Sequence, residues 1–298
     1  MYEIIDLYFQ GQPEIIASYV LRGPTGVALI ETGPGSTIDN LWGGLEYLGI
    51  EPGEITDILV THIHLDHAGA AGELASETGA RVHVHHVGAP HLADPSRLLR
   101  SAKRIYGDLM DPLWGETLPV PADQIRVLQD GDIIEAAGLR IQALDTPGHA
   151  YHHMAYLLDG LCFTGDVAAV RLPGYDHIRL PTPPPEIDVP AWLASLDRLR
   201  ELRPDRLLPT HFGPVDGDPL RHLDGVATNL NAYVDFVRPR WQKGESAGEM
   251  TADLQQWVAA QAVADGCDPD AVHRYEVVVP SYMQASGLVR YLKKFEEA

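Results

Sequence analysis

The chain has 298 residues, of which 45% are hydrophobic and 21% are charged, as in soluble globular proteins with a buried core. Its formal net charge of −20 repels polyanions at long range, which argues against nucleic acid as the main substrate. The two cysteines are far apart in the sequence and form no CxxC pair, so neither a disulfide framework nor a thiolate zinc site is expected.

The start of the chain has neither a basic segment nor a small-residue cleavage site, so we expect no secretory signal. No stretch approaches 18 consecutive apolar residues, so we expect no membrane span. A cytoplasmic protein is the default expectation. The oligomeric state stays open, and a homo-oligomer is compatible with the apolar helix faces described below.

The first part of the chain alternates between short apolar runs and helical patterns. Strands are predicted near residues 15–21, 26–31, 55–60 and 81–85, and helices near 37–48 and from Ala68 to a stop at Gly79. This order predicts mixed sheets with covering helices. We interpret the alternate histidines at 83 and 85 as a hydrogen-bonded strand face rather than as metal ligands.

Residues 88–122 break this pattern, and a helix is predicted for 95–106. Arg97, Arg100 and Arg104 recur there at i, i+3 and i+7, which puts a basic stripe on an acidic protein. One interpretation is a solvated helix face. The other is an insertion that overhangs the functional loops and contacts an anionic substrate through Arg100, Arg104, Tyr106 and Trp114.

The second part predicts strands at 125–128, 139–144, 154–158, 161–164 and 206–209, with an Asp159-Gly160 hairpin turn and a helix at 191–202. Three of these strands end near a glycine-flanked His or Asp. From residue 222 the pattern is helical, with one apolar face formed by Leu223, Val226, Leu230, Tyr233 and Val237. We therefore expect a β-rich domain over 1–221, including the insertion at 88–122, and a helical extension over 222–298 packed on it.

Four side chains able to bind a metal crowd into the run His62-Ile63-His64-Leu65-Asp66-His67, directly after the predicted buried strand. Residues two apart in extended chain point the same way, so His62 and His64 should face a common point. Asp66 and His67 then turn with the chain, which suits two neighbouring ions better than one. Chance clustering among 14 histidines is the alternative, and the density of the motif argues against it.

This run, followed by Thr146-Pro147-Gly148-His149, Thr164-Gly165-Asp166 and Thr210-His211, resembles the metallo-β-lactamase superfamily, including its glyoxalase II-like branches, over about residues 15–215. The resemblance implies an α/β (α+β) fold, a four-layer αββα sandwich of two mixed β-sheets with helices outside. It also implies a ligand set in which one metal takes His62, His64 and His149, the other takes Asp66, His67 and His211, and Asp166 bridges them.

Two further positions follow from the resemblance. Glu31 stands where the family commonly has an aspartate outside the ligand set, which leaves its hydrogen-bond partner open. His153 matches a histidine that lies near the ligands in the glyoxalase II-like branches, and we take it with Asp66 as a catalytic candidate.

Imidazole and carboxylate donors without thiolate suit two divalent ions, Zn²⁺ first and Fe or Mn as alternatives. Two such ions lower the pKa of a bound water toward about 7, and the resulting hydroxide attacks a carbonyl or phosphoryl centre. Asp66 can orient that hydroxide. The leading hypothesis is a dinuclear hydrolase of a small ester, thioester, lactone or amide.

Three alternatives stay open. The same metals support phosphodiesterase or nuclease chemistry, although the net charge opposes long polyanions. A mononuclear iron sulfur-dioxygenase would use only the His62, His64, His149 and Asp166 type of ligation. A non-enzymatic metal-binding module would be signalled by missing ligands, and none is missing here. A flavodiiron electron-transfer role is disfavoured because no flavodoxin-like extension follows the motifs.

Overall fold

A computed structural model of the chain describes residues 2–296. Its strands are β1 (Tyr2–Asp6), β2 (Ala17–Gly23), β3 (Gly26–Ile30), β4 (Ile55–Leu59), β5 (Arg81–His85), β6 (Ile125–Leu128), β7 (Ile133–Ala136), β8 (Leu139–Asp145), β9 (Met154–Leu158), β10 (Leu161–Gly165) and β11 (Arg206–Pro209). Its α-helices are α1 (Ile38–Tyr47), α2 (Leu65–Ala68), α3 (Ala71–Thr78), α4 (Ala89–Ala93), α5 (Ser96–Tyr106), α6 (Met110–Trp114), α7 (Val189–Leu202), α8 (Pro219–Gln242), α9 (Ala247–Ala264), α10 (Pro269–Val278) and α11 (Ser281–Glu296).

These elements form two compact units. Unit 1 contains Met1–Asp145 and His152–Phe163, and unit 2 contains Thr146–Tyr151 and Thr164–Ala298. The predicted fold class is confirmed, with two β-sheets and helices in an α+β chain. The predicted boundary between 1–221 and 222–298 stays a prediction.

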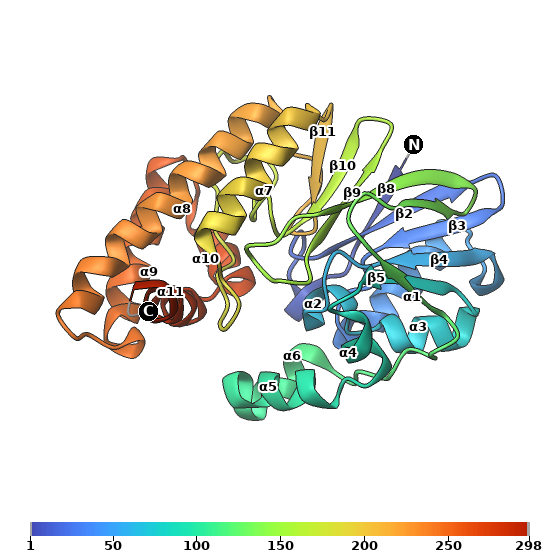
Figure 1. Cartoon of the computed structure of the whole chain (residues 1–298), viewed down its shortest axis with the longest axis horizontal. Coiled ribbons are helices and arrows are strands. Elements are labelled where there is room, and N and C mark those ends of the chain that lie inside the picture. The colour runs from blue at the N-terminus through green and yellow to red at the C-terminus, as the bar shows by residue number, and fades with distance from the viewer. Residues whose placement is uncertain (1, 297–298) are drawn as a thin grey trace. The chain divides into compact units, whose positions relative to one another are not determined.

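The first sheet lies in unit 1 and has the order β1-β2-β3-β4-β5-β6. Its first three strands are antiparallel and the rest are parallel, so the sheet is mixed. Ile58 and Leu59 of β4, and Val60 after it, are fully buried, as expected of a central parallel strand covered on both faces. Each such side chain stabilises the fold by about 1.5–3 kcal/mol. The helices α1 and α3 lie along one face of this sheet (Figure 1).

Within unit 1 the second sheet is an antiparallel meander of β7, β8, β9 and the first residues of β10. The predicted hairpin is confirmed, because Asp159 and Gly160 both have positive φ (47° and 81°), as its two-residue turn requires. The sequence did not predict β7, because its exposed Ile133 and buried Ile134 are both apolar and the run therefore shows no clear alternation. The two sheets of unit 1 meet where the ring of Phe163 lies 5.2 Å from that of Tyr19.

A polar network links β4 and β5, two inner strands of the first sheet. His83 Nε2 lies 2.8 Å from Asp57 Oδ1, and the same carboxylate accepts hydrogen bonds from Arg81 and from the backbone N–H of Ala137. Burial raises the pKa of Asp57, but the bonds from His83, Ala137 and Arg81 outweigh it and hold that pKa well below its usual range. The interpretation of His83 as a hydrogen-bonded strand residue is confirmed.

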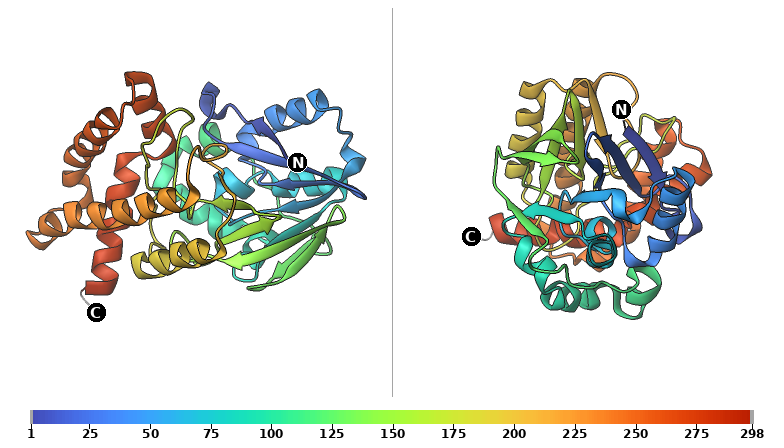
Figure 2. Two further views of the ribbon diagram at one scale, coloured as in Figure 1. Left: turned by 90° about the horizontal axis from the view of Figure 1, so that it is seen from above. Right: turned by 90° about the vertical axis from the view of Figure 1, so that its right-hand side faces the viewer.

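The C-terminal helices belong to unit 2, where α11 packs on α8 and α9 (Figure 2). Every residue of the predicted apolar face of α8 is fully buried: Leu223, Val226, Leu230, Tyr233 and Val237. The Asp218 side chain begins this helix by accepting a hydrogen bond from the N–H of Leu220. Among residues 2–296, no helix is both long and apolar enough to cross a membrane.

Candidate metal centre

The motif half-set, His62, His64, Asp66 and His67, lies in unit 1 at the carboxyl end of β4. Two helices stand where one helix was predicted to begin at Ala68. The short α2 begins earlier and carries Asp66 and His67, and α3 follows it and is capped by Gly79. His62 Nε2 lies 2.9 Å from His64 Nδ1, so the two rings face one point as their spacing predicts. The rings of His62 and His67 are 4.0 Å apart.

A buried hydrogen-bond chain orients these imidazoles. The hydroxyl of Thr61 donates to Glu31 Oε1, so its oxygen is left to accept from His62 Nδ1 at 3.1 Å. This assigns the proton of His62 to Nδ1 and leaves the lone pair of Nε2 available to a metal. His67 Nδ1 lies 3.1 Å from the same Glu31 oxygen, so His67 likewise presents Nε2, at 3.7 Å from Asp66 Oδ2.

Glu31 stands where the resemblance led us to expect an aspartate, and its hydrogen-bond partners are now defined. Its carboxylate accepts from the side chain and the N–H of Thr61 and from His67, and it is fully buried. The residue has a φ of 67°, a left-handed conformation that costs a side chain about 1–3 kcal/mol. The bonds to Thr61 and His67 offset that cost.

Two more histidines of unit 1 lie beside the motif half-set. The buried His153 ring is 5.1 Å from that of His62. The sequence pattern gave no role to His152, yet its ring lies 5.5 Å from that of His64 and its Nδ1 accepts from the N–H of Ile63 at 3.4 Å. The only sequence signal for His152 was its position next to His153.

The strand-end half-set, His149, Asp166 and His211, lies in unit 2. Asp166 directly follows β10 and His211 follows β11 after one residue. Asp166 Oδ2 lies 3.3 Å from His149 Nε2, and Asp166 Oδ1 lies 3.5 Å from His211 Nε2. The two oxygens of one buried carboxylate thus face two different imidazoles.

Backbone contacts fix His149 in a single orientation. Its Nδ1–H donates to the carbonyl of Pro181 at 2.8 Å, which leaves Nε2 as the atom facing Asp166. The residue before it must be glycine, because Gly148 has a φ of 135° and a Cβ there would lie 2.3 Å from the Cα of Trp192. The TPGH motif therefore combines a ligand with the close helix contact that aims it.

The donor atoms of both half-sets fit divalent cations. All are imidazole nitrogens or carboxylate oxygens, a set that suits Zn²⁺ and also accepts Fe or Mn. In His62, His67 and His149 the other ring nitrogen is already hydrogen-bonded to an oxygen, as is usual for metal-binding histidines.

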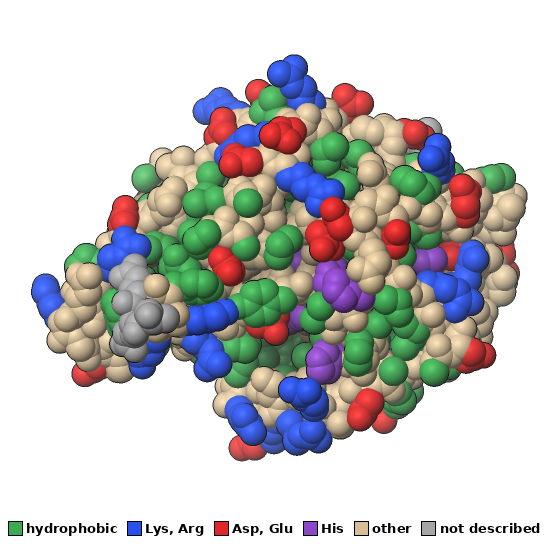
Figure 3. Space-filling model, in the orientation of Figure 1, with side chains coloured by type: hydrophobic (Ala, Val, Ile, Leu, Met, Phe, Trp, Pro, Cys, Tyr) green, Lys and Arg blue, Asp and Glu red, His purple; other side chains and the backbone are tan. Residues whose placement is uncertain are grey.

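The four predicted substrate-contact residues lie on or beside α5 and α6 in unit 1. Arg100 and Arg104 are exposed, and basic side chains gather over α5 at the lower edge of the space-filling view (Figure 3). Trp114 is only 7% exposed, stacked on Phe9 at 5.6 Å, with the Tyr106 ring edge-on at 5.0 Å. Trp114 thus anchors the insertion, and its contact with a substrate stays a prediction.

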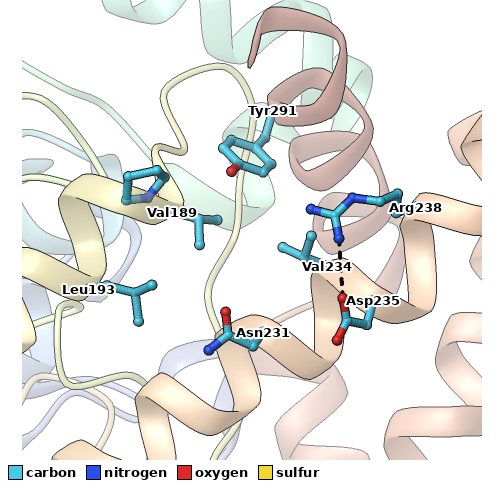
Figure 4. A pocket seen from close by; sticks show the side chains of 8 residues that line it. Val189, Leu193, Asn231, Val234, Asp235, Arg238 and Tyr291 are labelled. Carbon is cyan, nitrogen blue, oxygen red and sulfur yellow. Dashed lines mark hydrogen bonds and ion pairs between the residues drawn. The ribbon is translucent and has the colours of Figure 1, made fainter. Parts of the chain in front are cut away.

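A pocket of about 260 Å³ lies within unit 2 among α7, α8 and α11 (Figure 4). Its walls are apolar at Leu193 and Val234, and at one side Arg238 pairs with Asp235 at 3.2 Å. The pocket is lined by none of the candidate ligands, so it plays no part in the proposal for the metal centre.

Comparison with known proteins gives one family. The sequence profile described as the metallo-beta-lactamase superfamily matches residues 11–211. The metallo-beta-lactamase fold-containing protein ST1585 of Sulfurisphaera tokodaii is 31% identical over 206 residues, which are 68% of this chain and 75% of that protein. The crystal structure titled as ST1585 from Sulfolobus tokodaii matches with a TM-score of 0.62 and 28% identity over 76% of this chain and 85% of that one.

Two further relatives are named as hydrolytic enzymes. A hydroxyacylglutathione hydrolase of Rhodopseudomonas palustris is 34% identical over 115 residues, 39% of this chain and 34% of that protein. An atrochrysone carboxyl ACP thioesterase of Aspergillus fumigatus is 26% identical over 216 residues, 70% of this chain and 41% of that protein. The matched regions thus span less than half the length of these two relatives.

Proposed function

The chain belongs to the metallo-β-lactamase superfamily of hydrolases, and from that premise we propose that it hydrolyses a small thioester or a related ester, lactone or amide with two divalent metal ions. The motif half-set and the strand-end half-set would together supply the ligands, with Zn²⁺ as the first expectation and Fe or Mn as alternatives.

The observation that carries this proposal is the geometry of Asp166. Each of its oxygens faces the Nε2 of a different histidine, at 3.3 Å for His149 and 3.5 Å for His211. If each of these histidines binds a different ion, the carboxylate between them is placed to contact both ions. This supports a bridging role and therefore two ions rather than one.

When bound, such a pair of ions would lower the pKa of a water molecule and polarise the carbonyl of the substrate. The residues of this chain have complementary tasks. Glu31 and Thr61 hold His62 and His67 in one tautomer, so that their Nε2 lone pairs stay available. Asp66, about one quarter exposed, can accept a proton from the attacking water. The buried His153, whose ring lies 5.1 Å from that of His62, is the second catalytic candidate.

A thioester heads the list of substrates because two relatives carry names of that chemistry, a hydroxyacylglutathione hydrolase and an ACP thioesterase. The exposed Arg100 and Arg104 of α5, next to Tyr106, add a basic surface to an acidic protein. We infer that this surface attracts an anionic group of the substrate.

The test is metal analysis of the purified protein together with hydrolysis of a thioester, a lactone, a β-lactam and a phosphodiester. We expect two metal ions per chain, thioester hydrolysis, loss of activity after chelation, and recovery after Zn²⁺ is restored. His62→Ala should abolish hydrolysis, and Tyr47→Ala at a highly exposed site of unit 1 is the control.

Other outcomes would overturn the proposal in distinct ways. One iron ion per chain with oxygen consumption on a persulfide would favour a sulfur-dioxygenase. Cleavage of the phosphodiester alone would favour a phosphodiesterase. Full activity in the metal-free protein would exclude a metal-dependent mechanism, and metal binding without any hydrolysis would favour a binding module.

A further inference from the structure

The backbone stretch 177–182 of unit 2 controls the orientation of His149. The carbonyl of Pro181 accepts the Nδ1–H of His149 at 2.8 Å, and both residues lie in the buried part of the unit. A shift of this carbonyl would release the imidazole or turn Nε2 away from Asp166. The position of the stretch is therefore a condition for the ligand geometry.

The C-terminal helices hold this stretch by its backbone. Asn229 of α8 donates to the carbonyl of Ile178 at 2.9 Å, and the hydroxyl of Tyr275 in α10 donates to the carbonyl of His177 at 2.8 Å. Both contacts, however, lie three or four residues before Pro181, so they fix the start of the stretch rather than the carbonyl that His149 uses.

Gln284 of α11 forms hydrogen bonds with the two residues that flank Pro181. Its Nε2 donates to the carbonyl of Leu180 at 2.8 Å, and its own backbone carbonyl accepts from the hydroxyl of Thr182 at 3.4 Å. The two bonds flank Pro181 on either side. Gln284 is fully buried, so water cannot replace either bond.

A glycine one turn along the helix lets α11 come this close. A Cβ on Gly287 would lie 1.9 Å from the carbonyl oxygen of Thr182 and 3.0 Å from the backbone carbon of Pro183. An alanine there would push the helix and the stretch apart. The amide of Gln284 and the missing side chain of Gly287 therefore serve the same contact.

We propose that Gln284 is a positioning residue for the metal ligand His149, acting through the carbonyls of Leu180 and Pro181. This rests on the proposed metal-dependent function and deepens it, because it gives the C-terminal helices a role in the ligand geometry. The bond from Nδ1 keeps the proton of His149 on that atom, so that Nε2 is ready for the metal.

The experiment compares Gln284→Leu with Ser286→Ala. Leucine is close in volume and removes the donor, while Ser286 is a half-buried residue of the same helix whose hydroxyl bonds within it, to Tyr282. Zinc affinity is measured by competition with a chelator well below the unfolding temperature, and thermal unfolding of the metal-free proteins is measured in parallel.

We expect Gln284→Leu to bind zinc about tenfold more weakly than the wild type. This is the lower end of the range seen when a metal ligand loses a supporting hydrogen bond. The control should bind as the wild type does. Gln284→Asn, which keeps an amide but shortens the side chain, should weaken binding in the same direction and serves if the leucine variant does not fold. NMR of the metal-free protein should show the Nδ1–H of His149 protected in the wild type and exchanging faster in either variant.

The metal-dependent function and the role of Gln284 fail on different outcomes. If the wild type binds no metal, the proposed function is wrong. If the wild type binds zinc and both Gln284 variants bind it equally well with an unchanged His149 signal, Gln284 is no positioning residue. A lower unfolding temperature with unchanged zinc affinity also excludes the positioning role, because it shows that Gln284 is purely structural.

Discussion

The two half-sets contain the same types of donor atom, but their residues are distributed differently along the sequence. The motif half-set comes from one six-residue run, and Glu31 and Thr61, which orient its imidazoles, lie just after the neighbouring strands β3 and β4. The strand-end half-set gathers residues 149, 166 and 211. The backbone carbonyl of Pro181 orients one of them, and the neighbouring carbonyl of Leu180 accepts a hydrogen bond from α11. The first half-set is largely local in sequence, and the second depends on long-range packing.

The two half-sets should therefore respond to different substitutions. We expect a substitution far along the sequence, in α11, to disturb the strand-end half-set without changing a candidate ligand. The motif half-set has its main support in Glu31 and Thr61, which are tied to it directly. Substitutions in each half-set, and in the residues that orient it, test this difference.

The largest effect is expected from Asp166→Asn. An amide offers one oxygen instead of two and carries no charge, so it cannot hold two cations, and hydrolysis should fall on the order of 1,000-fold. Metal content, measured in the same preparation, should drop below two ions per chain. Asp159→Asn, in the exposed hairpin turn before β10, is the control and should keep full activity. Wild-type activity in Asp166→Asn would remove the bridging role.

Acid should loosen unit 2 through His222 of α8. Burial lowers the pKa of His222 to about 4, with a small further lowering from Arg171 and opposition from its bond to the carbonyl of Ala168. Above pH 6.5 the residue is neutral in both the folded and the unfolded protein, so it causes no pH dependence there. Between pH 6.5 and 4 only the unfolded chain takes up the proton, so the free energy of unfolding should fall by about 3 kcal/mol.

His222→Gln should remove this part of the pH dependence, because its amide can still donate to the Ala168 carbonyl but cannot be protonated. Denaturant unfolding of the metal-free protein at pH 7, 5.5 and 4.5 measures it. His273→Gln, outside the buried core on α10, should keep the wild-type slope. Equal slopes in all three proteins would show that His222 is not the group responsible.

Glu31→Gln tests the support of the motif half-set. The variant keeps the shape of the side chain but removes the charge that raises the basicity of His67, so metal affinity should fall about 10- to 100-fold. Titration of metal-free protein with Zn²⁺ measures this, and Glu3→Gln on the exposed β1 edge is the control. An unchanged affinity would mean that the negative charge of Glu31 does not contribute to metal binding.

The smallest effect is expected on the basic surface of α5. Reversing Arg100 and Arg104 to glutamate should raise KM for an anionic substrate about fivefold with little change in kcat, since exposed charges contribute weakly and are screened by salt. The double variant Lys243→Glu and Lys293→Glu, which changes the net charge equally in the C-terminal helices, should leave KM unchanged. Unchanged kinetics for the α5 variant would indicate that its basic stripe is only a solvent-exposed helix face without a role in substrate binding.

Much of the fold was predictable because its signals are local. The apolar run before the motif, the Asp159-Gly160 turn and the apolar face of α8 each depend on a few neighbouring residues, and the structure confirms them. The early start of α2 and the strand β7 were missed. The helix α2 is a single turn, and β7 begins with two apolar residues of which only the second is buried, so neither shows a clear period. The seven candidate ligands were predicted from motifs, and their joint binding of two metal ions stays a proposal.

The donor types, the strand-end positions of the candidate ligands and the family could all be read from the chain alone. Which nitrogen His62, His67 and His149 offer depends on folding. The deciding oxygen belongs to Glu31 for His67 and to Pro181 for His149, 36 and 32 residues away, and for His62 it is the hydroxyl of the adjacent Thr61, which is itself held by Glu31. Hydrogen bonds between distant segments leave no periodic pattern in the chain. They exist only after the strands and helices have packed.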